Sequence, residues 1–92
     1  MSERKNYNSK LVKIGDHLKS KRMCLGDECR TREGFISDRS DKLFQGEEWI
    51  SARYLANVEL GKNQISFEKF IMLSYALECD PVELFSEIME IL

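Results

Sequence analysis

Few side chains in this 92-residue chain are suited to nucleophilic or metal chemistry: His17, Cys24, Cys29 and Cys79. Cys24 and Cys29 are five positions apart, unlike the two-residue-spaced knuckle that zinc sites typically use, so we interpret the cysteines as structural and predict no metal site. His17 falls among lysines in a predicted helix, where a histidine is usually a surface residue. No nucleophile and base are paired by their spacing, and the sequence has no glycine-rich phosphate loop. The sequence therefore predicts a protein that is not an enzyme and has no cofactor.

Length and composition exclude further classes of protein. Ninety-two residues make one small domain with a thin core, which leaves no room for a deep catalytic cleft. No apolar run approaches the ~18 residues of a membrane span, and the polar N-terminal segment does not resemble a signal peptide. Because the number of cysteines is odd, we expect a cytoplasmic protein with reduced thiols. No small-molecule ligand is evident.

Charge is distributed unevenly along the chain. The net charge is −2 at pH 7, but residues 1–64 hold 13 basic and 10 acidic side chains, whereas residues 65–92 hold 1 and 6. Residues 1–22 alone hold 7 basic and 2 acidic side chains. This asymmetry predicts that one end of the chain meets an anionic partner, although a solvated basic tail would give the same pattern.

The hydrophobic pattern predicts a compact all-α domain of about five short helices, since no segment alternates with a period of two. Residues 1–9 are interpreted as a flexible basic arm and residues 10–92 as a single domain. The first helix is expected to begin with Ser9 as its N-cap and to end near residues 23–26. The second helix is expected to be capped by Thr31 and to carry its apolar residues on one face: Phe35, Ile36, Leu43 and Phe44. A loop over residues 45–48, broken at Gly46, follows this helix.

Cap residues also predict the three remaining helices. Ser51, Ser66 and Asp80 are expected as N-caps, Gly61 ends the third helix, and Pro81 takes the first position of the fifth. The fourth helix is expected to bury six side chains: Phe67, Phe70, Ile71, Leu73, Ser74 and Leu77. The fifth helix carries apolar residues on more than one face, which is a common sign of an interface. We therefore predict a dimer surface on the last helix: Phe85, Ile88, Met89 and Leu92.

The third predicted helix has an outer face suited to reading DNA. Tyr54, Leu55 and Val58 would face the core, which leaves five residues outside: Ser51, Ala52, Arg53, Ala56 and Asn57. Arg53 can donate a bidentate pair to guanine, Asn57 can pair with adenine, and a small alanine can contact a thymine methyl group. A helix fits the major groove, and its N-terminal residues reach the base edges.

Residues 50–61, ISARYLANVELG, resemble the recognition-helix signature of the Cro/phage-repressor helix-turn-helix family, also called XRE-like. The signature is a β-branched residue, Ser, two variable residues, Tyr, an aliphatic, a small residue, a variable one, an aliphatic, Glu, a variable one and Gly. Residues 62–85 resemble the family's basic loop, fourth helix and ending, and residues 14–19 and 31–36 resemble its first helix and the start of its second. One departure stands out, because 14 residues separate Ile36 from Ser51, more than the family uses. Either the second helix is longer here, or a loop around residues 45–49 bulges out.

The resemblance implies a lambda-repressor-like, five-helix fold with a helix-turn-helix and an enlarged region between its second and third helices. It implies base contacts from Ala52, Arg53 and Asn57. The phosphate contacts that it implies come from both helices of the motif: Ser51, Tyr54, Lys62, Asn63, Thr31 and Arg32. Tyr54 is equally consistent with a core position, and Glu59 lies where the family holds an acid that anchors the helix.

We therefore predict a sequence-specific transcriptional regulator that binds double-stranded DNA as a homodimer, with residues 51–60 in the major groove. The alternative is a protein-interaction or antitoxin-like module that keeps the fold and binds its partner through the last helix. The near-neutral third helix, with one arginine and no lysine before Lys62, leaves this alternative open. Trp49, beside the long connection, is interpreted as a packing anchor.

Overall fold

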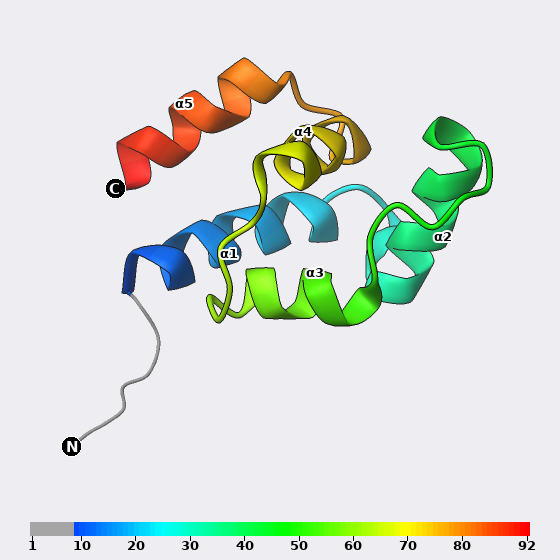
Figure 1. Cartoon of the computed structure of the whole chain (residues 1–92), viewed down its shortest axis with the longest axis horizontal. Coiled ribbons are helices and arrows are strands. Elements are labelled where there is room, and N and C mark those ends of the chain that lie inside the picture. Colours follow the sequence, from blue (N-terminus) through cyan, green and yellow to red (C-terminus); the bar gives the residue numbers. More distant parts are fainter. Residues whose placement is uncertain (1–8) are drawn as a thin grey trace.

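A computed structural model describes residues 9–92, and this part of the chain is all-helical without a strand (Figure 1). The elements follow in the order α1 (Ser9–Met23), the short 3-10 helix η2 (Asp27–Cys29), α2 (Arg32–Leu43), α3 (Ala52–Glu59), α4 (Phe67–Ala76) and α5 (Pro81–Ile91). The prediction of a five-helix all-α domain is confirmed. The predicted arm of residues 1–9 lies, apart from Ser9, outside the described residues. No helix within residues 9–92 is long and apolar enough to cross a membrane.

Side-chain caps start the last four α-helices at the predicted residues. The hydroxyls of Thr31, Ser51 and Ser66 accept hydrogen bonds from the backbone N–H three residues later, at 3.0, 3.0 and 3.2 Å. The Asp80 carboxylate accepts from the N–H of Val82 at 2.8 Å, with Pro81 in the first helical turn. Each cap satisfies a backbone donor that the helix leaves open, which sets where the helix begins. Ser9, in contrast, is itself the first residue of α1 rather than a residue before it.

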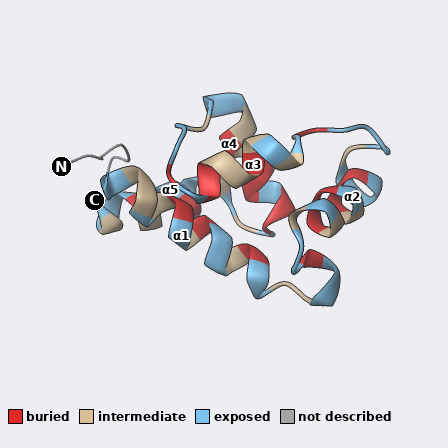
Figure 2. Cartoon of the chain, turned by 90° about the horizontal axis from the view of Figure 1, so that it is seen from below, coloured by how far each residue is buried: buried red, intermediate tan, exposed pale blue. Residues whose placement is uncertain are grey.

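The helix α1 lies in the middle of the domain. It packs against α3 on one side and against α5 on the other, while α2 packs against α3 and η2 (Figure 1). One core joins all five α-helices, and each contributes at least one almost fully buried side chain: Leu18, Phe35, Leu55, Leu73 and Leu84. Figure 2 colours the chain by burial and shows buried stretches in red alternating with exposed stretches in pale blue along the helices. The core therefore fixes the position of α3 relative to the rest of the chain.

The long region between the second and third helices combines the two expected features, a longer second helix and an extended connection. The helix α2 extends to Leu43, and residues 44–51 then form an open connection with Gln45 and Gly46 in the left-handed region at φ of 60° and 81°. Trp49 belongs to this connection, but its side chain is buried. Its ring stacks on that of Phe44, with 4.9 Å between the ring centroids. Its indole Nε1 also donates to the carbonyl of Ile36 at 3.2 Å. Trp49 is therefore the packing anchor that was predicted.

Two residues predicted to face the core are exposed instead. Phe67 is 78% exposed, because it opens α4 at the rim of a surface groove rather than beneath another helix. Leu43 is 48% exposed at the last position of α2, where the chain turns away into the connection. Periodicity identifies the face of a helix, but it does not show how far along the helix its neighbours extend.

Candidate nucleic-acid interface

The C-terminal end of α3 is held against α1 by two close backbone approaches. A Cβ atom on Gly15 would lie 2.3 Å from the carbonyl oxygen of Glu59, and one on Gly61 would lie 2.7 Å from the Cα of Val12. Gly61 also has a φ of 80°, which allows the chain to leave α3 in the left-handed conformation. Any larger residue at either position would push α3 away from α1.

A buried carboxylate ties the ends of three helices together. Glu59, at the end of α3, accepts from Arg22 Nε at 2.7 Å and Nη2 at 3.0 Å, and from Arg32 Nε at 2.8 Å. The remaining Arg22 nitrogen, Nη1, donates to the carbonyls of Cys29 and Arg30 at 2.7 and 3.0 Å. Arg22 and Glu59 are both almost fully buried. The structural role predicted for Glu59 is thereby confirmed, and its partners from α1 and α2 are findings that the sequence pattern did not identify.

Of the residues predicted to contact bases, Arg53 and Asn57 lie on the outward side of α3, whereas Ala52 packs partly against the core at the start of the helix. Arg53 is exposed, and within residues 9–92 its guanidinium makes no hydrogen bond or ion pair. Ala52, Ala56 and Asn57 are half-buried, whereas Leu55 and Val58 are buried on the opposite face. The arrangement leaves one free cationic side chain beside one amide and one small side chain.

The residues predicted to contact phosphates fall into three groups: exposed residues just beyond α3, exposed helix caps, and side chains with partners inside the chain. Lys62 and Asn63 are exposed just beyond α3, and their backbone N–H groups donate to the carbonyl of Asn57 at 2.8 and 3.3 Å. Thr31 and Ser51 are exposed, but each hydroxyl oxygen accepts the capping bond of its own helix. The loop that carries Lys62 and Asn63 is thus continuous with the outward side of α3.

Arg32 and Tyr54 have partners inside the chain. Arg32 is half-buried, and its Nε donates to the buried Glu59 carboxylate, so the side chain orients α2 against α3. The hydroxyl of Tyr54 accepts from the backbone N–H of Ser66 at 2.9 Å, which joins α3 to the cap of α4. The contact of Arg32 occupies its Nε donor, whereas the Tyr54 hydroxyl acts only as an acceptor here, so its O–H can still donate to a phosphate.

Acidic side chains gather beside the start of α3, a feature that the sequence pattern does not indicate. Glu33, Asp41 and Glu48 line an open pocket of about 340 Å³ that also contacts Ala52. Glu47 is exposed next to them. The only hint in the sequence is the adjacent pair Glu47-Glu48, because Glu33 and Asp41 join it only through the packing of α2. The outward face of α3 therefore has an acidic end at Ala52 and a basic side at Arg53 and Lys62.

The histidine and the three cysteines lie away from the outward side of α3. His17 Nε2 lies 2.8 Å from a carboxylate oxygen of Glu87, and the Lys21 Nζ lies 3.1 Å from the same oxygen. Hydrogen bonds from His17 and then Lys21 hold the pKa of Glu87 below its ordinary value. Cys29 is buried, which raises the pKa of its thiol, while Cys24 is exposed and Cys79 half-buried. Within residues 9–92 no group of three or more histidine, cysteine or acidic side chains is placed to hold a metal ion.

Of the four residues predicted for the dimer surface, three are exposed and one is buried, and one further exposed residue was not predicted. Phe85, Met89 and Leu92 are exposed, as expected for interface residues. Ile88 is buried in the chain's own core, because it lies one helical turn from Leu84 on the inward side of α5. Val82, which was not predicted, is 75% exposed on the outward side.

Comparisons of the chain with models of known protein families, with curated proteins and with solved structures find no match. Any function assigned to this chain therefore depends on its own residues and their geometry.

Proposed function

We propose that this protein is a sequence-specific transcriptional regulator that binds double-stranded DNA, with α3 in the major groove. The observation that carries the proposal is that Arg53, on the outward side of α3, is exposed and has no hydrogen-bond or ion-pair partner within residues 9–92. By contrast, the other four arginines in this part of the chain form ion pairs: Arg22, Arg30, Arg32 and Arg39. An arginine kept free on a rigid helix is available for bidentate bonding to guanine.

The surroundings of Arg53 support the same proposal. Asn57 lies four residues later on the same side, where its amide can pair with an adenine edge. The small side chain of Ala56 would let α3 approach the groove floor closely. The Glu59 network and the two glycine contacts hold α3 rigidly, so little ordering would accompany binding.

The resemblance of residues 50–61 to the Cro/phage-repressor signature is a second support. The connection of residues 44–51 departs from the turn of about three to four residues that a helix-turn-helix normally uses. We therefore expect α3 and the loop with Lys62 and Asn63 to supply the contacts, and α2 to contribute less than in that family. A protein bound in this way at a promoter would block or recruit RNA polymerase.

The acidic end of α3 sets a limit on the affinity of one copy. DNA carries a negative charge about every 1.7 Å along its axis, so Glu47 and Glu48 would be repelled wherever the duplex passes residues 47–52. We expect weak binding by a single domain, and two copies on adjacent half-sites to provide the useful affinity.

A second candidate is a protein-interaction or antitoxin-like module. It is favoured by the exposed apolar side chains of α5 and by the near balance of charge around α3. In this case α3 would be an ordinary surface helix, and α5 would bind the partner.

A salt titration distinguishes the two candidates. Binding of the protein to a mixed-sequence duplex is measured by fluorescence anisotropy, with the chloride concentration raised from about 50 to 200 mM. A DNA reader binds at the lowest salt and loses affinity steeply, in proportion to the phosphates that it neutralises. Selection from random duplexes would then give the preferred site. If no binding occurs at about 50 mM salt, the proposal for DNA is wrong and the protein-interaction module is favoured.

A further inference from the structure

We infer that Cys24 and Cys79 form a reversible oxidation site, at which a hydroperoxide joins the two side chains in an intramolecular disulfide. The two cysteines are far apart in the sequence, but they line one open pocket of about 440 Å³. Cys24 is exposed and Cys79 is half-buried, so an oxidant can reach both from solvent. Neither thiol belongs to the proposed DNA contacts, so this site is separate from the proposed function.

The packing of α1 against α5 brings the two cysteines to one end of the domain. The two helices are in contact and run in opposite directions (Figure 1). Lys21 on α1 meets Glu87 on α5, with 3.1 Å between the ammonium nitrogen and a carboxylate oxygen. Beyond Lys21 the chain reaches Cys24, just after α1 ends, and in an antiparallel pair this direction leads back to the start of the other helix. Cys79 lies at that start, immediately before the cap of α5.

Both cysteines lie in turns rather than inside helices. Cys24 follows the last residue of α1, and Cys79 belongs to the turn between α4 and α5, next to Glu78 with its φ of 62°. A disulfide requires the two Cα atoms to lie within about 7 Å of each other. Because both residues lie in turns, their backbones can adjust to this requirement without breaking the hydrogen bonds inside a helix.

Lys21 gives the Cys79 thiol an environment that favours reaction. The pKa of Lys21 is raised, first by its hydrogen bond to Glu87 and then by its interaction with Cys79, to which it also hydrogen-bonds. A lysine beside a sulfur stabilises the thiolate, which is the form that attacks an oxidant. The Glu78 carboxylate also lines the pocket, but it is paired with Arg39 at 3.0 Å. We therefore assign the first attack to Cys79.

The reaction is balanced with one hydroperoxide as the oxidant. The Cys79 thiolate attacks the terminal oxygen, the O–O bond breaks, and the alcohol or water that leaves takes up the thiol proton. Cys79 is then a sulfenic acid. The Cys24 thiol attacks its sulfur, the S–O bond breaks, and water leaves as the disulfide closes. Two thiols thereby lose two electrons and two protons, and the peroxide is reduced.

Cys29 has the opposite environment and provides an internal control. Its side chain is fully buried in the core, and burial raises the pKa of its thiol. A buried thiol in apolar surroundings reacts poorly, so the structural interpretation of the cysteines suits Cys29. Peroxide should therefore distinguish Cys29 from the other two cysteines.

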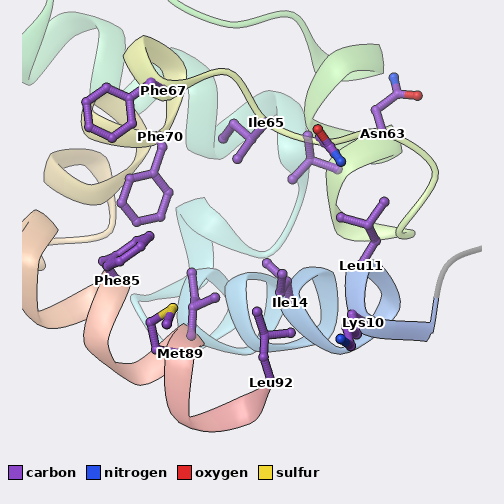
Figure 3. Close-up of a pocket in the computed structure, with 13 residues that line it drawn as sticks. Lys10, Leu11, Ile14, Asn63, Ile65, Phe67, Phe70, Phe85, Met89 and Leu92 are labelled. Atoms are coloured by element: carbon purple, nitrogen blue, oxygen red, sulfur yellow. The ribbon is translucent and has the colours of Figure 1, made fainter.

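The disulfide would fasten the end of α1 to the turn before α5. The groove of about 500 Å³ in Figure 3 lies between the same two helices, with Ile14 from α1 and with Met89 and Leu92 from α5 in its walls. The crosslink would therefore restrain the helices that form this groove. It would also restrict the unfolded chain, so the oxidised protein should melt several degrees above the reduced protein.

The test is peptide mapping by mass spectrometry after treatment with about a tenfold excess of hydrogen peroxide, with the protein at about 10 µM to disfavour links between molecules. We expect one peptide pair joined through Cys24 and Cys79, which dithiothreitol separates, and an unmodified Cys29. Cys24→Ser should form no disulfide, should lose the rise in melting temperature, and should leave Cys79 as a sulfenic acid that a cyclic 1,3-diketone captures. Cys29→Ala is the matched control and should form the disulfide like the wild type. Circular dichroism checks that each variant is folded.

A second measurement tests the role of Lys21. In the Cys24→Ser background, Lys21→Gln should slow the capture of Cys79 about threefold or more, whereas Lys21→Arg keeps the cation and should keep most of the rate. An unchanged rate in Lys21→Gln would overturn the assignment of Cys79 as the attacking thiol.

Several results would overturn the disulfide itself. These are two thiols that stay reduced, oxidation of either cysteine to a sulfinic acid without a link, or links that involve Cys29 or a second molecule. Because the mapping needs no DNA, a failed salt titration would leave its result unchanged, and a missing disulfide would leave the proposed DNA binding unaffected.

Discussion

Arg22 and Glu59 lie 37 positions apart and form a buried ion pair with two hydrogen bonds, of 2.7 and 3.0 Å. This pair joins the end of α1 to the end of α3, and Arg32 joins α2 to the same carboxylate. The proposed reading helix is therefore positioned by electrostatics as well as by packing. A buried carboxylate with two guanidinium partners is costly to disturb, because removing it leaves uncompensated buried charge.

We expect Glu59→Gln to destabilise the domain by about 3–5 kcal/mol, since Arg22 would stay buried without a counter-charge. Urea denaturation followed by circular dichroism measures the loss. Glu83→Gln, an exposed carboxylate on α5 without a partner in the described chain, is the control and should change stability by less than about 0.5 kcal/mol. A similar small effect for Glu59→Gln would mean that the network does not support the fold.

Gly61 and Gly46 provide a matched pair for the contact between α3 and α1. Their φ angles are 80° and 81°, so alanine is strained equally at both, at about 1–2 kcal/mol. Only at Gly61 does the new Cβ meet another part of the chain, 2.7 Å from Val12, whereas nothing lies within 4 Å at Gly46. We expect Gly61→Ala to cost about 1–3 kcal/mol more than Gly46→Ala in urea denaturation. Equal losses would show that the close approach to α1 adds nothing.

Replacing Arg53 tests how α3 meets DNA. Arg53→Ala should weaken binding to the selected site by about 1–3 kcal/mol and relax the preference at one base pair. Arg53→Lys keeps the charge but not the bidentate fork, so it should retain binding to mixed-sequence duplex while losing the base preference. Both are measured by anisotropy at one fixed salt concentration. If Arg53→Ala weakens binding equally on all sequences and Arg53→Lys restores it, Arg53 contacts a phosphate rather than a base.

Neutralising the acidic side chains beside the start of α3 should increase the affinity of the protein for DNA. Glu47→Gln combined with Glu48→Gln should tighten binding to any duplex roughly twofold or more at low salt, because repulsion from the phosphates is removed. Glu83→Gln with Glu90→Gln on α5 removes the same charge far from α3 and should have little effect. Equal gains from both double variants would show that only total charge matters and that residues 47–52 do not face the DNA.

Stability should depend on pH through Glu87. Hydrogen bonds from His17 and then Lys21 hold the pKa of this carboxyl below its ordinary value in the folded chain, so its contribution to stability is complete above the unfolded-state pKa and is lost as the pH falls through the folded-state pKa. Glu87→Gln should therefore lower the melting temperature at neutral pH. The difference from wild type should shrink as the pH is lowered through the folded-state pKa and disappear once the carboxyl is protonated in both states. A difference that persists there would point to packing rather than charge.

The local features of this fold follow from short stretches of sequence. Thr31, Ser51, Ser66 and Asp80 each start a helix by bonding a backbone N–H within the next three residues, so no distant part of the chain is needed to locate them. The same holds for Gly61 at the end of α3 and for the outward placement of Arg53, since both depend on helical periodicity. The all-α class, the starts of the last four α-helices and the outward position of Arg53 were predictable for this reason.

Only the tertiary structure decided which side chains meet across the chain. The pairing of Arg22 and Arg32 with Glu59, and the approach of Glu33 and Asp41 to the start of α3, depend on how separate helices cross, which periodicity does not encode. The same applies to Ile88 and Val82, because two faces of α5 are apolar in the sequence and only packing against the core selects the face with Leu84 and Ile88. Burial is a property of the neighbours as well as of the residue, so the exposed apolar side of α5 was visible only once the helices were placed.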